Sequence, residues 1–419
     1  MVNKIKSLLQ NYLIKGSLII LIGNLLASVI NYLYHLFIGK LLSPSQYGIL
    51  ASFISLSYFT GVFGGALSLA IVNLISPLKN SLVLPAVKSV EKIFLKISLT
   101  AWIVALLLYP LIKEFLHLQS FGIYFVFSWQ IFFSFLIIIY QATLQAKLKF
   151  FKFSILGIWS AVLRICLAVF FVFLGFQAAG ALGGIVFSLL GTIILGRFFI
   201  YKQWQNKSTK TLKKFKFQND FWKYSGLTLL TNTALISIYS SDVLLARYFF
   251  SSFKSGIYAA TSVLGKIIFF ASSSLILVAF PLFIKYKNDN KKLKKIFAYS
   301  LFIVLLIGTI GSIVYKLVPE FIINSLYNQS YIEAVSLLPS FALFISLAAV
   351  LTLIIHFLLA KESKLSLVVA SLTALCQLIL NLINHPTLMS LIINSTLSMI
   401  FGLLLGVFSV IKVINVSKK

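Results

Sequence analysis

Acidic side chains are scarce in this 419-residue chain, which has 8 Asp and Glu residues against 36 Lys and Arg residues. Cysteine and histidine are scarcer still, and both cysteines, Cys166 and Cys376, lie within apolar runs. The sequence therefore offers no disulfide framework, no metal-ligand spacing and no paired carboxylates, and it lacks a phosphate-cradling glycine loop after a strand. We expect the protein not to be an enzyme and to hold neither a metal nor a cofactor.

Charge of either sign is also infrequent, since only 11% of the residues are charged and 60% are hydrophobic, with a mean hydropathy of +1.02. Ordinary soluble proteins have about a quarter charged and about half apolar residues. This composition excludes that class and places the chain in a lipid bilayer. The formal net charge of +28 would favour nucleic acid as the partner of a soluble domain. In a membrane protein the positions of the lysines matter more, so we expect no nucleic-acid partner.

Apolar runs long enough to cross a bilayer recur along the chain, because about 20 apolar residues cover roughly 30 Å of hydrocarbon. Twelve such runs lie near residues 17–39, 47–75, 93–112, 121–144, 153–174, 177–200, 225–249, 256–284, 296–318, 334–360, 364–383 and 387–411. Only Gly175, Phe176 and Gln177 separate the fifth run from the sixth. We therefore predict an all-α polytopic membrane protein with twelve transmembrane helices.

The distribution of lysine and arginine orients these spans, since both residues accumulate in cytoplasmic loops. If the N-terminus is inside, all but seven of the 36 cations fall in inner segments. The exceptions are Lys40, Lys113, Arg247, Lys254 and Lys316 in outer segments, and Arg164 and Lys266 within spans. We predict that both termini are cytoplasmic.

The second half of the chain repeats the first at an offset of 208 positions. Asn24 aligns with Asn232 in the first span of each half, and Gly48 aligns with Gly256 in the turn that follows. Six spans separate the copies, so both halves have the same orientation, as in transporters built from parallel repeats. We expect two six-helix lobes, residues 1–201 and 225–419, joined by a basic cytoplasmic linker over 202–224.

Three segments resemble a known family. Residues 41–48, LLSPSQYG, follow the first span, and residues 241–249, SDVLLARYF, precede SGIYAA at 255–260. Both resemble bacterial polysaccharide and oligosaccharide flippases of the multidrug/oligosaccharidyl-lipid/polysaccharide exporter superfamily, and the glycine-rich residues 180–184 are similar to that family's sixth span. The likeness covers spans one, two and six to eight, and the last four spans only in number and order.

The resemblance implies a flippase that moves an undecaprenyl-pyrophosphate-type lipid-linked oligosaccharide from the inner to the outer leaflet for cell-surface polysaccharide biosynthesis. The glycan and pyrophosphate would pass through a cavity between the lobes by alternating access. It also implies a monomer in the cytoplasmic (plasma) membrane of a bacterium or archaeon, with a polysaccharide polymerase and glycosyltransferases as further partners. Lipid II flippases of the superfamily have a cation on the eighth span, where Lys266 lies here, but their additional spans and first-span cations have no counterpart.

Two cations lie near mid-depth, Arg164 in the fifth span and Lys266 in the eighth. A charge at a helix centre costs about 2.5–3.5 kcal/mol on insertion scales, so such residues face a cavity or a partner. We expect both to bind the pyrophosphate. Asp242 in the seventh span is at a depth where a long lysine can reach it, so a structural ion pair with Lys266 is an alternative, and a pair that opens for substrate would combine the two. Asp242 is also the candidate for gating or for coupling to a proton or Na⁺.

Polar residues on the first span of each lobe are candidate sugar ligands: Asn24, Asn31, Asn232 and Tyr239. Small polar side chains also join helices to one another, which is the alternative for all four. Arg247, near the outer end of its span, is expected to extend to the lipid headgroups. The glycines at 61, 64 and 65 and at 180, 183 and 184 are expected to allow close helix contact or hinging.

Two other functions compete with the flippase interpretation. An ion-coupled antiporter of the multidrug and toxic compound extrusion type shares the two-lobed architecture, but it exports cations and so needs buried carboxylates. The mid-depth charges here are mainly cationic. A membrane-embedded polysaccharide polymerase usually needs a sizeable extramembrane loop, whereas the longest outer segment, residues 318–333, is short.

Overall fold

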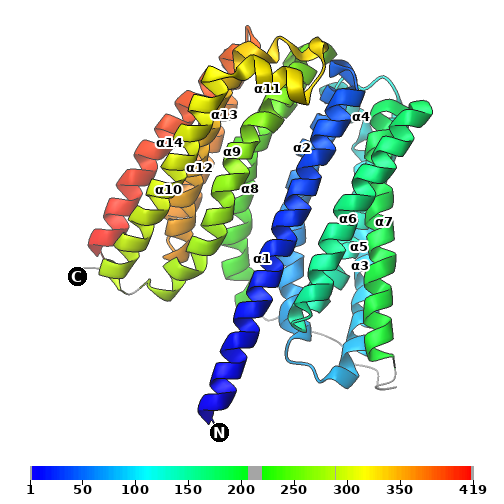
Figure 1. Ribbon diagram of the computed structural model, residues 1–419, viewed down its shortest axis with the longest axis vertical. Coiled ribbons are helices and arrows are strands. Elements are labelled where there is room, and N and C mark those ends of the chain that lie inside the picture. The colour runs from blue at the N-terminus through cyan, green and yellow to red at the C-terminus, as the bar shows by residue number, and fades with distance from the viewer. Residues whose placement is uncertain (1, 206–218, 288, 417–419) are drawn as a thin grey trace. The chain divides into compact units, whose positions relative to one another are not determined.

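A computed structural model describes residues 2–205, 219–287 and 289–416, and every regular element in these ranges is helical (Figure 1). The described chain divides into two compact units. Unit 1 comprises Met1–Leu42 and Thr60–Phe217, and unit 2 comprises Ser43–Phe59 and Gln218–Lys419. Residues 206–218 of the predicted linker lie outside the described residues, and the predicted lobe boundaries stay a prediction.

Unit 1 is built from α1 (Val2–Leu41), the part of α2 (Pro44–Ile75) from Thr60 onward, α3 (Asn80–Leu107), α4 (Tyr109–Phe115), α5 (Phe121–Ala146), α6 (Phe150–Phe171) and α7 (Gln177–Trp204). The helix α7 packs against α5 and α6, α6 packs against α1, and α3 packs against α5. Buried side chains of α3, α5 and α7, among them Val87, Ile139 and Trp204, form one hydrophobic core. Burial of this apolar surface holds the helices of the unit together.

A helical hairpin occupies residues 150–204. Between α6 and α7 the wide turn Val172–Phe176 contains Gly175, whose φ of 91° lies in the left-handed region that glycine adopts at no steric cost. The two helices then pack side by side (Figure 1). The chain therefore breaks at the residues that the sequence marked as the separation between two spans.

Ten helices of the described chain are long and apolar enough to cross a membrane, or eleven if the bent pair α3 and α4 is one span. That count treats residues 150–204, the hairpin of α6 and α7, as a single candidate of 55 residues. The predicted all-α membrane fold is confirmed. The number of twelve spans and the cytoplasmic position of both termini stay predictions.

Among the glycines of α7, Gly184 makes the closest approach to the backbone of α6. A Cβ at Gly184 would lie 2.5 Å from the backbone of Ala168, whereas a Cβ at the adjacent Gly183 would make only an ordinary contact of 3.7 Å with the ring of Phe171. We expect Gly184→Ala to destabilise the protein by about 1–3 kcal/mol, because backbone atoms must move apart, and Gly183→Ala to be tolerated. Thermal unfolding of the purified variants measures the difference. Equal melting temperatures for both variants would contradict this packing.

Unit 2 contains, after Ser43–Phe59, the helices α8 (Asn219–Phe249), α9 (Ser252–Lys285), α10 (Asn290–Leu317), α11 (Pro319–Leu326), α12 (Ala334–Ala360), α13 (Leu365–Ile383) and α14 (Leu388–Val416), with a short turn η2 (Gln329–Tyr331). The helix α12 is largely buried and packs against α9, α10 and α14. The helix α13 packs against α8 and α14. A helix that is apolar all round and buried in this way belongs to the centre of a bundle.

The two units share details beyond the alignment at an offset of 208. In each, a long helix is followed by a short one with proline in its first turn, α3 and α4 in unit 1 and α10 and α11 in unit 2. In each, a lysine ends the next long helix: Lys147 after α5 and Lys361 after α12. Both amines donate to a backbone carbonyl of the turn after the unit's second helix, that of Leu78 and that of Lys287. Partial burial lowers the pKa of both lysines, and the charge of Lys287 adds to the effect at Lys361.

The first part of α2, within Ser43–Phe59, packs against the rest of unit 2 through small residues. A Cβ at Gly256 would lie 1.8 Å from the carbonyl oxygen of Pro44, and a Cβ at Gly48 would lie 2.8 Å from the backbone nitrogen of Gly256. The two glycines that align in the sequence repeat therefore contact each other. Nearby, the ring of Tyr47 is buried against Tyr327, with their hydroxyl oxygens 3.4 Å apart.

The remaining glycines of α2 differ from what their spacing led us to expect. Gly61 and Gly65 have no atom within 4 Å of a would-be Cβ, and only Gly64 approaches a neighbour, the Cδ1 of Ile138 at 3.3 Å. Close helix contact therefore applies to Gly64 in this stretch. In α7 it applies to Gly180 and Gly184.

Candidate functional site

The hairpin of α8 and α9 brings Asp242, Tyr258 and Lys266 together in unit 2. Asp242 lies seven residues before Phe249, the last residue of α8. Tyr258 lies seven residues after Ser251, the N-cap of α9. The turn therefore places both side chains at the same height along the two antiparallel helices. The Tyr258 hydroxyl donates to Oδ2 of Asp242 at 3.1 Å. Both residues are fully buried. Among the described residues, Oδ1 of Asp242 has no hydrogen-bond partner.

Lys266 lies eight residues beyond Tyr258 on α9, which is about 12 Å along the helix axis. Its side chain is 5% exposed and acts electrostatically on Asp242. Within the described part of the chain, no ion pair of 4.0 Å or less joins the two. The carboxylate and the ammonium thus interact electrostatically in a buried region, but the direct partner of Asp242 is Tyr258, which the sequence did not identify.

Tyr239 and Asn232 occupy the same helix as Asp242. The ring of Tyr239 packs between Phe269 of α9, with centroids 4.7 Å apart, and Tyr58 of α2, with centroids 6.2 Å apart. Asn232 lies two turns earlier on α8 and is half-buried. Tyr58 is the position that aligns with Lys266 in the sequence repeat, so an aromatic ring stands in the first copy where the second has a cation.

Arg247 is buried, which corrects the prediction that it extends to the lipid headgroups. Its side chain is 2% exposed, and its guanidinium donates to the Ser255 hydroxyl at 3.4 Å. Ser255 lies in the first turn of α9, so the guanidinium at the end of α8 contacts the start of the next helix. The turn between α8 and α9 therefore contains a buried cation that links the two helices.

In unit 1 the charge of Arg164 on α6 acts on Tyr34 of α1, which is buried and donates to the Ala181 carbonyl of α7 at 3.2 Å. Asn31 lies one turn before Tyr34, and its buried Oδ1 has no hydrogen-bond partner among the described residues. Asn24, two turns further away, is exposed. Arg164 of α6 and Asn31 of α1 thus both lie near Tyr34, whereas Asn24 is two turns further along α1.

A second polar cluster joins α13 to α14. The side-chain amides of Gln377 and Asn381 both donate to the Ser395 hydroxyl, at 3.0 and 3.4 Å, and all three side chains are fully buried. Asn394 donates to the Leu380 carbonyl at 3.1 Å. These bonds link the two helices, as expected for small polar side chains within a membrane bundle. This cluster is not predictable from the sequence, because its residues come from two separate spans.

Membrane-length helices that enclose buried charges define a membrane transport protein rather than a passive membrane anchor. The chain belongs to the family described as polysaccharide biosynthesis protein, which matches residues 37–336. None of the curated proteins matches it.

Solved structures show the same fold at low sequence identity. The chain is similar to the lipid II flippase MurJ in an inward closed conformation, with a TM-score of 0.70 and 18% identity over 95% of this chain and 89% of that one. It is also similar to an inward-facing multidrug resistance MATE family transporter, with a TM-score of 0.72 and 13% identity over 92% of this chain and 95% of that one. The MATE transporter DinF-BH matches with a TM-score of 0.66 and 18% identity over 94% of each chain. These likenesses establish the fold and leave the substrate open.

Proposed function

We propose that this protein is a flippase that moves a lipid-linked oligosaccharide of the undecaprenyl-pyrophosphate type from the inner to the outer leaflet of a bacterial or archaeal cytoplasmic membrane, for cell-surface polysaccharide biosynthesis. The observation that carries the proposal is Lys266, a cation buried within a candidate membrane span of a polysaccharide biosynthesis family member. A buried ammonium is costly unless it serves a partner, and its only nearby carboxylate in the described chain already accepts from Tyr258.

The proposed roles of the charged residues follow from their chemistry. The guanidinium of Arg164 presents paired N–H donors that match two oxygens of a phosphate, and the ammonium of Lys266 is a compact point charge for a third. When the pyrophosphate binds, Lys266 interacts with the negative charge of the substrate in place of the carboxylate of Asp242. Asp242 keeps the Tyr258 hydroxyl and has a free acceptor, Oδ1. It is therefore the proposed gating residue, and the position for a proton or Na⁺ if transport is ion-coupled.

The sugar-binding roles are assigned to the polar residues of the first helix of each half. Asn31 is the strongest of these, because its amide oxygen is buried and has no partner in the described structure. Tyr239 adds an aromatic ring framed by two others. Asn24 and Asn232 complete the proposed set.

The direction of transport follows from the membrane potential. With the cytoplasm negative, outward movement of an anionic carrier releases about 2.3 kcal/mol per charge per 100 mV. Alternating access could then export a pyrophosphate without a dedicated coupling ion. A glycosyltransferase would supply the substrate, a polysaccharide polymerase would consume it, and the flippase itself would act as a monomer.

A multidrug antiporter is the second candidate, because transporters of the MATE family share this fold. Export of organic cations requires carboxylates that face the substrate. In the described spans the deeply buried acid is Asp242, which has a tyrosine and a lysine as neighbours. That environment favours an anionic substrate.

Depletion of the protein in its own cells tests the proposal. We expect lipid-linked oligosaccharide to accumulate and to become inaccessible to a membrane-impermeant oxidant that labels glycans from outside, while its synthesis on the cytoplasmic side continues. Re-expression restores the labelling. Unchanged outside labelling after depletion, together with increased sensitivity to organic cations, would replace the flippase with the antiporter.

A further inference from the structure

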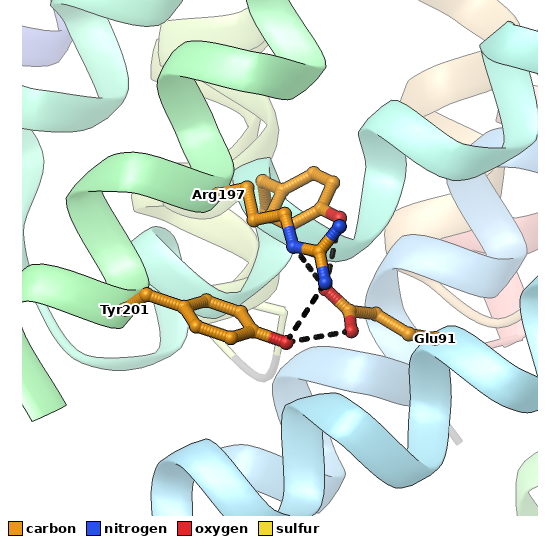
Figure 2. A network of polar contacts seen from close by, with 4 residues as sticks. Glu91, Arg197 and Tyr201 are labelled. Atoms are coloured by element: carbon orange, nitrogen blue, oxygen red, sulfur yellow. Dashed lines mark hydrogen bonds and ion pairs between the residues drawn. The ribbon is translucent and has the colours of Figure 1, made fainter. Parts of the chain in front are cut away.

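A network of polar contacts lies at the end of unit 1 where α7 ends. Glu91 of α3 accepts from the hydroxyls of Tyr140 on α5 at 2.9 Å and Tyr201 on α7 at 3.0 Å, as Figure 2 shows for Glu91 and Tyr201. Arg197, one turn before Tyr201, donates to the Tyr201 hydroxyl at 3.4 Å and lies 3.9 Å from Glu91. The carboxylate of Glu91 is therefore held by hydrogen bonds from α5 and α7, and Glu91 and Tyr201 together orient the guanidinium of Arg197. None of these residues has a role in the proposed transport.

The network leaves most of the guanidinium available. Arginine has five N–H donors, and each Glu91 oxygen accepts from a tyrosine hydroxyl at a shorter distance than the 3.9 Å that separates Glu91 from Arg197. The Arg197 side chain is 58% exposed, against 19% for Glu91. The structure thus presents an oriented, outward-facing cation rather than a closed ion pair.

Further cations surround Arg197. The ammonium of Lys88 on α3 lies 5.8 Å from the centroid of the Tyr201 ring, and the guanidinium carbon of Arg197 lies 5.0 Å from it. Lys202 of α7 lies 5.3 Å from the ring of Phe198. This surface thus has three cations, Lys88, Arg197 and Lys202, and one carboxylate, Glu91. Its net positive charge is complementary to an anion.

The depth of this surface is that of lipid headgroups. Towards the middle of the bundle from Glu91 and Arg197, α3 and α7 expose Leu95 and Ile194, and Phe198 next to Arg197 is also about half exposed. Towards the other side lies the end of α7 at Trp204. Apolar side chains that face outward beside a cluster of Lys, Arg and Tyr mark the boundary between hydrocarbon and headgroups. By the distribution of lysine in the sequence, this boundary is the cytoplasmic one.

We infer that Arg197 and Lys88 form a binding site for the phosphate of an anionic phospholipid in the cytoplasmic leaflet, with Glu91, Tyr140 and Tyr201 positioning the guanidinium. The Arg197 guanidinium donates to two phosphate oxygens, and Lys88 contributes a second charge. The lipid tails lie along the exposed apolar residues of α3 and α7. The inference does not depend on the proposed flippase activity, because the site lies within unit 1 and shares no residue with the transport site.

Lipid binding by the purified protein tests the inference. The melting temperature is measured in nanodiscs of phosphatidylcholine with increasing fractions of phosphatidylglycerol, and bound lipid is counted by native mass spectrometry. We expect phosphatidylglycerol to stabilise the wild type, and Arg197→Gln and Lys88→Gln each to weaken its binding about fivefold, since one cation near the surface contributes about 1 kcal/mol. The control, Lys316→Gln, removes an exposed lysine of α10 outside the site and should bind as the wild type does.

The outcomes separate the alternatives. Arg197→Lys keeps the charge and should retain at least half of the preference, which distinguishes a lost ligand from a misfolded variant. If Arg197→Gln and Lys316→Gln weaken binding equally, the protein has only a diffuse positive surface and the site is refuted. If inorganic phosphate stabilises the protein as well as phosphatidylglycerol does, the lipid is not the ligand. Leaflet transport of the oligosaccharide by Arg197→Gln in phosphatidylcholine should equal that of the wild type.

Discussion

Alanine at both Arg164 and Lys266 is expected to abolish movement of a lipid-pyrophosphate oligosaccharide across the bilayer. A hydrogen bond to a charged group contributes about 1.5–3 kcal/mol, so each single variant should lose roughly ten- to hundredfold in transport. Lys266 is buried next to Asp242, and Arg164 lies beside Tyr34 in the other unit. The measurement is the rate of leaflet reversal of a labelled substrate in proteoliposomes.

Stability must be separated from transport in this series. Lys266→Ala leaves the fully buried Asp242 without its nearby cation, which should destabilise the protein by about 1–3 kcal/mol. Adding Asp242→Asn removes the uncompensated charge and should restore the melting temperature while transport stays low. Lys316→Ala, an exposed lysine of α10, serves as the control for loss of a positive charge. Full activity of the Arg164→Ala/Lys266→Ala variant would remove both residues as substrate ligands.

Gly256→Ala is expected to disrupt the packing of α2 against α9, because the added methyl group collides with backbone. Its Cβ would lie 1.8 Å from the Pro44 carbonyl oxygen and 2.8 Å from the Pro44 Cα, so the obstruction is backbone and not a flexible side chain. The segment Ser43–Phe59 must move away from α9, which also draws Tyr47 out of its contact with Tyr327. Overpacking of this kind costs about 1–3 kcal/mol, and more where backbone must shift.

Gly61→Ala is the matched control for this variant, because no atom lies within 4 Å of its would-be Cβ. Alanine also has a higher helix propensity than glycine, by about 1 kcal/mol. We therefore expect Gly61→Ala to be neutral or stabilising, and Gly256→Ala to lower the melting temperature and to increase protease cleavage near residue 43. Equal stability of the two variants would show that the glycine contact does not hold the segment in place.

Much of the fold could be predicted from hydrophobic runs and turn residues. Continuous apolar stretches specify membrane helices with little ambiguity, and the left-handed Gly175 lies where two stretches were separated by three residues. The repeat of Gly48 and Gly256 was visible as an alignment, but their direct contact was not, because an alignment contains no information about which copies touch. The equivalent contacts of Lys147 and Lys361 were not predictable for a related reason, since the spacing between equivalent helices changes after the third helix of each unit.

The candidate site was predictable only in part. Buried charges stand out in apolar sequence, so Arg164, Asp242 and Lys266 were identifiable from the cost of placing them in a membrane. Their partners were not. Counting residues from the outer end suggested Lys266 as the partner of Asp242, whereas the turn of the hairpin brings Tyr258 to its level. Counting residues outward from the turn on both helices would have found it.

Long-range contacts account for the other differences. The prediction that Arg247 extends to the headgroups was wrong, because it used only the depth of the residue along its own helix. The contact with Ser255 on the next helix does not follow from that depth. Glu91, Tyr140 and Tyr201 come from three helices, and their contact depends on how α3, α5 and α7 pack. Such a network becomes visible only in the folded unit.

The most direct measurement is leaflet reversal by the purified wild-type protein in proteoliposomes, with a lipid-pyrophosphate oligosaccharide and an organic cation supplied in parallel and the membrane potential set by a potassium gradient. We expect transport of the oligosaccharide and not of the cation, and faster movement towards the positive side, because about 2.3 kcal/mol is released per charge per 100 mV. Transport of the cation alone would contradict the flippase. Oligosaccharide movement that ignores the imposed potential would contradict the proposed driving force.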